Sequence, residues 1–197
     1  MGKVTTRAIA QAPELRAEGT ETRLVGYAAV FNQRTDIGGM WTEEIAPGAF
    51  RAAIADGADV RALFNHDANH VLGRTVSGTL TLREDETGLR YEIAPPSTAI
   101  GQSVVESVRR GDVTGSSMGF AVRAEEWTRA ATPGELPVRR ITEIDYLRDV
   151  GPVTFPAYEQ TTADAEARSQ AAALAVPVVD LRENERLLTL LAIDEVE

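Results

Sequence analysis

The chain has 197 residues, of which 43% are hydrophobic and 25% charged, as is typical of a soluble globular protein with one domain and an extension. It contains no cysteine, which excludes disulfides, thiolate metal ligands and cysteine nucleophiles. Its formal net charge of −10 argues against a nucleic-acid-binding protein, because phosphate neutralisation needs clustered Lys and Arg.

The predicted elements are mainly strands. In chain order they are a strand over 22–31, a short helix over 47–57, a short strand over 60–64, a hairpin with arms 79–84 and 89–94, a helix over 97–112, and strands over 116–122 and 138–150. From Thr161 onward Ala, Glu and Leu dominate, which predicts two tail helices separated by Pro177. No apolar stretch is long enough to span a bilayer, and the N-terminal residues lack the apolar core of a secretory signal. A cytoplasmic protein without membrane contact is therefore expected.

Both histidines of the chain, His66 and His70, lie four positions apart in one segment. Histidine is the usual proton shuttle near neutral pH, so any histidine-dependent chemistry involves this segment. A zinc pair on one helical face is one interpretation, but Asp67 stands where zinc hydrolases of the H-E-x-x-H type have Glu, and Gly73 opposes a long helix. A catalytic base beside a bystander, and two surface histidines without a role, are the alternatives.

A serine nucleophile is the other candidate for chemistry, and it requires a base and an orienting acid brought together by the fold. The segment GDVTGSSMGF, residues 111–120, presents two serines among glycines that permit tight backbone geometry. Ser-Gly turns are common, however, and most of them only form hydrogen bonds to their own backbone. This segment alone is therefore a weak signal.

Six blocks of the chain together resemble the tailed-phage prohead maturation proteases of the HK97 type. In the family's order and at ordinary spacing they are LVGYAAVFN (24–32), EEIAPGAF (43–50), LFNHDANHVLGRT (63–75), LTLREDETGL (80–89), RRGDVTGSSMGF (109–120) and DVGPVTFPAYEQT (149–161). The resemblance implies an α+β, mainly β fold similar to that of the herpesvirus maturational protease. This fold is a compact β-barrel surrounded by helices, here with a C-terminal helical extension. The implied division is a flexible segment over 1–20, a protease domain over 21–162 and a helical tail over 163–197.

The resemblance also implies a catalytic triad that needs no cofactor and no metal. The family's catalytic histidine corresponds to His66, and its nucleophile, two residues before Gly-Phe, corresponds to Ser117. The orienting acid corresponds to Asp149, where the family more often has Glu. His70 is then a bystander, and Ser116 is the alternative nucleophile.

The orienting acid stays open when the residues are considered by themselves. In a regular strand Glu143, Asp145 and Asp149 point the same way, so any of the three could face the histidine. Backbone amides near Gly115 to Met118, or near Arg148 and Val150, are candidate donors to the oxyanion. Either Arg148 or Arg74 could add positive charge there.

Partners follow from the resemblance. A serine endopeptidase of this family is expected to act inside the immature capsid in the host cytoplasm, on scaffold or on an extension of the major capsid protein, and on itself. Herpesvirus-type relatives order their sites by dimerisation, so a homo-oligomer is a further expectation. Direct contact with nucleic acid or membrane is not expected. The rival interpretation is a catalytically inactive structural or scaffolding protein with the same fold.

Overall fold

The computed structural model of the chain describes residues 4–18, 21–55, 57–156 and 165–175. The strands are β1 Thr5–Ile9, β2 Glu14–Glu18, β3 Glu21–Val30, β4 Thr35–Ile37, β5 Trp41–Ile45, β6 Arg61–Leu63, β7 Val71–Arg74, β8 Leu80–Glu84, β9 Gly88–Ile93, β10 Gly115–Thr128 and β11 Val138–Val153. The helices are α1 Ala99–Arg110, α2 Ala165–Leu174 and the short 3₁₀ helix η1 Thr75–Ser77.

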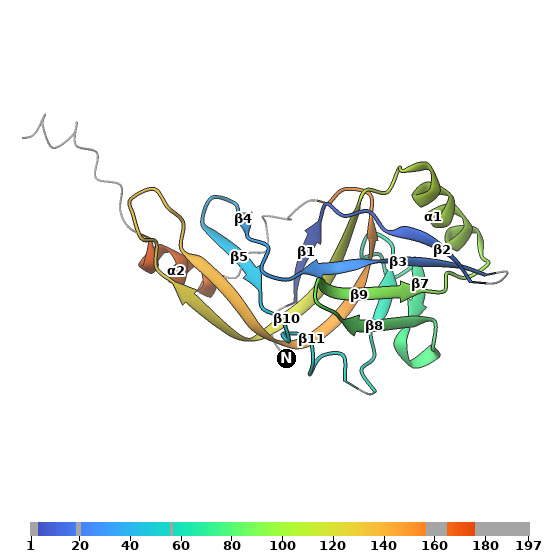
Figure 1. Cartoon of the computed structure of the whole chain (residues 1–197), viewed down its shortest axis with the longest axis horizontal. Coiled ribbons are helices and arrows are strands. Elements are labelled where there is room, and N and C mark those ends of the chain that lie inside the picture. Colours follow the sequence, from blue (N-terminus) through green and yellow to red (C-terminus); the bar gives the residue numbers. More distant parts are fainter. Residues whose placement is uncertain (1–3, 19–20, 56, 157–164, 176–197) are drawn as a thin grey trace, which may run out of the picture.

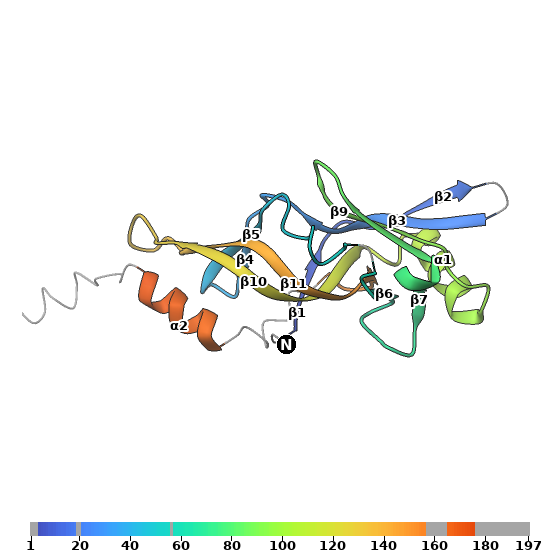
Figure 2. The same ribbon diagram turned by 90° about the horizontal axis from the view of Figure 1, so that it is seen from below.

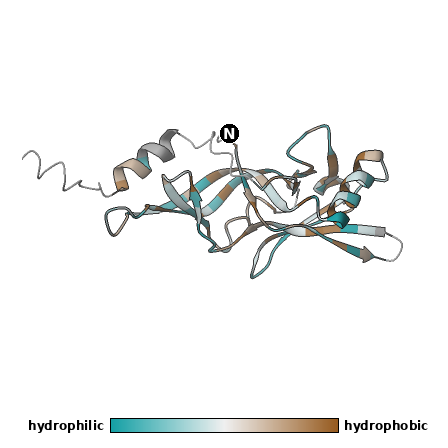
Figure 3. Ribbon diagram, turned by 90° about the horizontal axis from the view of Figure 1, so that it is seen from above, coloured by the Kyte–Doolittle hydropathy of each residue, from teal (hydrophilic) through white to brown (hydrophobic). Residues whose placement is uncertain are grey.

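The strands form two sheets that share one core (Figure 1). In the larger sheet the order is β1-β10-β11-β5-β4, and β6 pairs with both β11 and β7. In the smaller sheet the order is β2-β3-β9-β8. The core contains buried side chains from both sheets and from α1, among them Leu24, Tyr91, Val104, Phe120 and Leu147. Hydrophobic and hydrophilic residues alternate along the strands (Figure 3), as expected for sheets that bury one face.

The expected compact barrel surrounded by helices is wrong. Strands account for 48% and helices for 13% of the structure, and both sheets end in edge strands, so the described residues form no closed barrel. α1 and α2 lie near opposite ends of the long axis (Figures 1 and 2) and do not enclose the sheets. Alternating apolar residues predict that a sheet buries one face, but closure depends on the pairing of distant edge strands, which local sequence does not encode.

The expected C-terminal helical extension is also wrong for the part of the tail that the structure describes. There α2 packs on the larger sheet through Ala171, which is buried with Ile37 and Trp41. The second predicted tail helix lies outside the described residues. No helix in the described ranges combines the length and the apolar character needed to cross a membrane.

Two further segments differ from expectation. Residues assigned to a flexible segment before the domain form β1 and β2, and one of these strands joins each sheet. The helix predicted over 47–57 is a series of turns. Tertiary hydrogen bonds use backbone groups that a helix would need. The Phe50 amide donates to Glu84 at 2.8 Å, and the Ala49 carbonyl accepts from the Ile144 amide at 2.8 Å.

Candidate active site

The long antiparallel pair β10 and β11 carries two of the three predicted catalytic residues. Ser117 lies opposite Gly151, and Asp149 lies opposite Gly119 two positions further along β10. Because side chains two positions apart project from the same face of a sheet, Ser117 and Asp149 are diagonal neighbours on one face. Diagonal neighbours are separated by roughly 7–8 Å, which is too far for a direct hydrogen bond but leaves room for an imidazole ring between them.

Two glycines allow the groups around Ser117 and Asp149 to approach each other this closely. A Cβ added to Gly119 would lie 2.5 Å from Asp149 Oδ1 and 3.0 Å from a guanidinium nitrogen of Arg148. A Cβ added to Gly151 would lie 2.1 Å from the Leu63 carbonyl oxygen, at the end of β6. The first glycine therefore leaves space for the carboxylate, and the second allows the chain before the histidine to approach β11.

His66 reaches the site through a sharp turn after β6. β6 runs parallel to β11, with Arg61 opposite Asp149, so both strands lead toward the same end of the sheet. Asn65 and His66 then adopt left-handed backbone conformations, with φ of 53° and 59°. Non-glycine residues pay about 1–2 kcal/mol for this conformation, although Asn and His tolerate it better than most.

Asn65 anchors this turn to the end of β11. Its amide N–H donates to the Pro152 carbonyl at 3.1 Å, its side-chain oxygen accepts from the Thr154 amide at 2.8 Å, and its side-chain nitrogen donates to the Thr154 hydroxyl at 3.1 Å. Sequence reasoning missed this positioning role. The only signal available was the position of Asn immediately before the histidine, where a left-handed turn residue is well tolerated.

The imidazole of His66 lies between the serine and the carboxylate. Its Nε2 is 2.6 Å from Ser117 Oγ, and its Nδ1 is hydrogen-bonded to Asp149 Oδ2. This geometry assigns the proton to Nδ1, which donates to the carboxylate, and leaves Nε2 as an acceptor for the serine proton. Ser117 and Asp149 are almost completely buried, whereas 23% of the His66 side chain is exposed.

Arg148 holds the other oxygen of the carboxylate. Its Nε donates to Asp149 Oδ1 at 2.6 Å. Burial raises the pKa of the Asp149 carboxyl, but the hydrogen bonds and charges of His66 and Arg148 outweigh this effect, so the pKa lies below its usual value. The carboxylate therefore stays ionised at neutral pH. The other arginine considered in this region, Arg74, instead pairs with Asp59, with Nε 2.7 Å from Oδ1.

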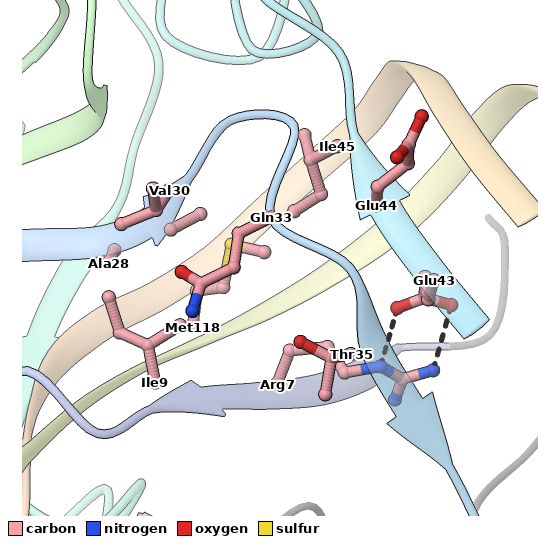
Figure 4. Close-up of a pocket in the computed structure, with 11 residues that line it drawn as sticks. Arg7, Ile9, Ala28, Val30, Gln33, Thr35, Glu43, Glu44, Ile45 and Met118 are labelled. Carbon is pink, nitrogen blue, oxygen red and sulfur yellow. Dashed lines mark hydrogen bonds and ion pairs between the residues drawn. The ribbon is translucent and has the colours of Figure 1, made fainter. Parts of the chain in front are cut away.

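The edge strand β1 contacts the serine directly. Ser117 Oγ is 2.9 Å from the Arg7 carbonyl oxygen, which can accept the hydroxyl proton in competition with His66. The Arg7 side chain points to the opposite face of β1, where its Nε and Nη2 donate to Glu43 at 2.6 and 3.1 Å (Figure 4). Sequence reasoning missed this contact as well, because it assigned these residues to a flexible segment.

Ser116, the alternative nucleophile, faces away from His66. Its hydroxyl is 2.8 Å from the Tyr91 hydroxyl and 3.1 Å from the Gln11 carbonyl oxygen. Successive residues of a strand project from opposite faces, so a site that includes Ser117 excludes its neighbour. Burial raises the pKa of the Tyr91 phenol, which therefore remains protonated.

The alternative acids lie elsewhere because β11 is irregular. The pairing skips Arg148 between the Gly119–Asp149 and Phe120–Leu147 pairs, which is a β-bulge. The expectation that acids at alternating positions share one face is therefore wrong beyond this bulge, since such insertions redirect the side chains that follow. Glu143 and Asp145 instead pair with the exposed side chain of Arg123, at 3.3 and 3.0 Å.

The second histidine takes no part in this arrangement. His70 Nδ1 is 3.4 Å from Asp67 Oδ2, and its ring lies 6.4 Å from that of Phe64. Within the described part of the chain, no group of three or more His, Asp or Glu side chains is arranged to hold a metal ion.

Comparison with known proteins identifies the family. The model of the family described as caudovirus prohead serine protease matches residues 9–175. The chain belongs to this family. This match confirms the resemblance to phage prohead proteases, while the narrower HK97-type assignment stays a prediction. Among solved structures, the bacteriophage T4 capsid assembly protease, gp21, is 11% identical, with a TM-score of 0.48 over 77% of this chain and 96% of that one. No curated protein shows significant sequence similarity to the chain.

The glycine opposite Asp149 gives a test of the geometry in this member of the family. Replacing Gly119 with alanine would place a Cβ within 2.5 Å of Asp149 Oδ1 and force the carboxylate to move. We expect the kcat for substrate cleavage to fall by about 10²-fold, because displacements near 1 Å have effects of this size. The measurement is cleavage kinetics together with a thermal unfolding curve. A folded variant with unchanged kcat would contradict the inferred role of the carboxylate.

Proposed function

We propose that the protein is a serine endopeptidase of procapsid maturation in which Ser117 is the nucleophile, His66 the general base and Asp149 the orienting acid. The observation that carries this proposal is the unbroken hydrogen-bonded series from Ser117 Oγ through the imidazole to the carboxylate. The three side chains come from three elements that lie far apart in sequence. Membership of a serine protease family supports the same reading.

The proposed reaction is acyl transfer. His66 Nε2 accepts the proton of Ser117 as the serine oxygen attacks a peptide carbonyl, and the imidazole becomes an imidazolium ion. Asp149, which accepts the Nδ1 hydrogen bond, stabilises this positive charge and keeps the ring in the reactive orientation. His66 then protonates the departing amine. Water enters, loses its proton to the same nitrogen and hydrolyses the acyl-enzyme.

The surroundings of Asp149 favour a carboxylate that stabilises the imidazolium ion. It is buried, so its attraction for an imidazolium ion is weakly screened. Arg148 occupies the oxygen that the imidazole does not use, which restricts rotation of the carboxylate group. The low pKa of Asp149 favours a fixed negative charge over proton transfer from the imidazolium.

The proposed substrates are scaffold or an extension of the major capsid protein, with cleavage inside the procapsid, and the protease itself. We further propose that the tail from about residue 163 serves in targeting to the capsid or is removed during self-processing. A homo-oligomer remains part of this proposal. The rival function is an inactive structural capsid-assembly protein, which would keep the fold without an activated serine.

A fluorophosphonate probe separates these two functions. An activated serine oxygen attacks the phosphorus, fluoride leaves, and the proton passes to the histidine. The full chain, co-expressed with its capsid protein, should form an adduct that mass spectrometry locates on Ser117. A parallel sample with a metal chelator should react equally. Absence of the adduct, with the protein folded, would favour the inactive structural role.

A further inference from the structure

An open pocket adjoins the nucleophile on the exposed side of His66. It is lined by Ser117 and His66 and by Thr6, Ala8, Asn65, Val153, Thr154 and Phe155, and it encloses about 310 Å³. This volume is near the lower end of the ~300–1,000 Å³ typical of small-molecule sites, so it suits one side chain and adjoining backbone. The pocket drawn in Figure 4, on the other face of β1, encloses only about 30 Å³, roughly the space of one water molecule.

The described walls of the pocket beside Ser117 carry no side chain of Asp, Glu, Lys or Arg. Apart from Ser117, His66 and Asn65, these walls are formed by Ala8, Val153, Phe155 and the two threonines. Within the described residues, two ionised groups close to the site are already engaged, because Asp149 is buried between His66 and Arg148 and the Arg7 guanidinium binds Glu43 on the opposite face of β1. A charged substrate side chain would lose water here without meeting a counter-charge from the described residues, which is unfavourable.

Phe155 is the most unusual of these residues. It is 82% exposed, although large apolar side chains usually avoid such exposure, and it stands at the rim of the pocket. The other exposed large hydrophobic residues of the described chain, Val71 and Val76, do not line the pocket. An apolar substrate side chain that packs on Phe155 would remove apolar surface of both partners from water, which favours binding.

We propose that this pocket binds the side chain of the substrate residue whose carbonyl Ser117 attacks, and that it accepts an uncharged, apolar side chain packed against Phe155. The inference rests on the proposed function, because it takes Ser117 as the nucleophile. Ser117 and His66 line the same pocket, so the attacked carbonyl lies at its mouth. The Cα bonded to this carbonyl carbon carries the side chain of the same residue. That side chain is therefore the part of the substrate best placed to enter the pocket.

The test uses the full chain and an equimolar set of peptides that differ only at the residue before the scissile bond. We expect cleavage after Leu, Val, Met or Ala at least tenfold faster than after Asp, Glu, Lys or Arg. Thr6→Glu adds a carboxylate to a half-buried pocket position and should raise relative cleavage after Lys and Arg about tenfold. Ala10→Glu, which adds the same charge at an exposed position outside the pocket, should leave the preference unchanged.

A second variant measures the apolar contact. Phe155→Ala should raise KM for the apolar peptide about tenfold with little change in kcat, since burial of an aromatic side chain contributes to binding by at least this factor. Val76→Ala, an exposed apolar change outside the pocket, should leave KM unchanged. Ser117-dependent cleavage that prefers charged residues, or an unchanged KM in Phe155→Ala, would overturn the pocket assignment. Either result would leave the proposed peptidase function standing. If the wild-type chain cleaves no peptide and Ser117 forms no fluorophosphonate adduct, both proposals fall.

Discussion

Replacing Ser117 with alanine is expected to lower the rate of capsid-protein processing by on the order of 10⁴-fold or more. The variant keeps the fold and the paired imidazole and carboxylate but has no oxygen to form the acyl-enzyme. Processing is measured as loss of full-length capsid protein on co-expression, with the product termini determined by mass spectrometry. Persistent cleavage at the same bond would exclude Ser117 as the nucleophile.

Ser116→Ala is the matched control for this variant. The two serines are neighbours in β10, but the Ser116 hydroxyl is hydrogen-bonded to the Tyr91 hydroxyl on the core side of the sheet. Its removal leaves a buried phenol without this partner, which should reduce the free energy of unfolding by about 1–3 kcal/mol. Processing should continue at temperatures where the protein stays folded. The pair of variants thus separates a catalytic hydroxyl from a structural one.

Replacing Asp149 with asparagine should lower kcat by on the order of 10⁴-fold and leave KM nearly unchanged. The neutral amide cannot stabilise an imidazolium ion, and it can bind the histidine tautomer in which Nε2 carries the proton and no longer accepts one. Steady-state kinetics on a peptide substrate measure the effect. Circular dichroism checks the fold, because Arg148 loses its ionic partner in this variant.

The other two acids of β11 provide the controls for this substitution. Glu143→Gln and Asp145→Asn each remove a carboxylate that pairs with the exposed Arg123, and such pairs contribute only about 0–1 kcal/mol to stability. Both variants should retain normal kinetics. A large loss of kcat in either one, with Asp149→Asn active, would move the orienting role to that residue.

The comparison of predicted and observed elements shows where local patterns suffice. The hairpin predicted over 79–84 and 89–94 is β8 and β9, and the helix predicted over 97–112 is α1, which ends before Gly111. Both elements are stabilised by hydrogen bonds within the segment and by the burial of one apolar face, which the local sequence pattern records. The helix predicted over 47–57 does not form, because Glu84 and the Ile144 amide bind backbone groups within it.

The sequence by itself restricted imidazole chemistry to His66 or His70, named Ser117 and Asp149 through the motifs that contain them, and identified the family. Only the tertiary structure decided that Ser117 faces the imidazole, that the register of β10 and β11 places Asp149 on the same face while the bulge at Arg148 turns the other two acids away, and that β1 contacts the nucleophile. Residue periodicity records which side chains a strand buries. Strand register, bulges and edge pairing depend on residues that are distant in sequence and adjacent only after folding.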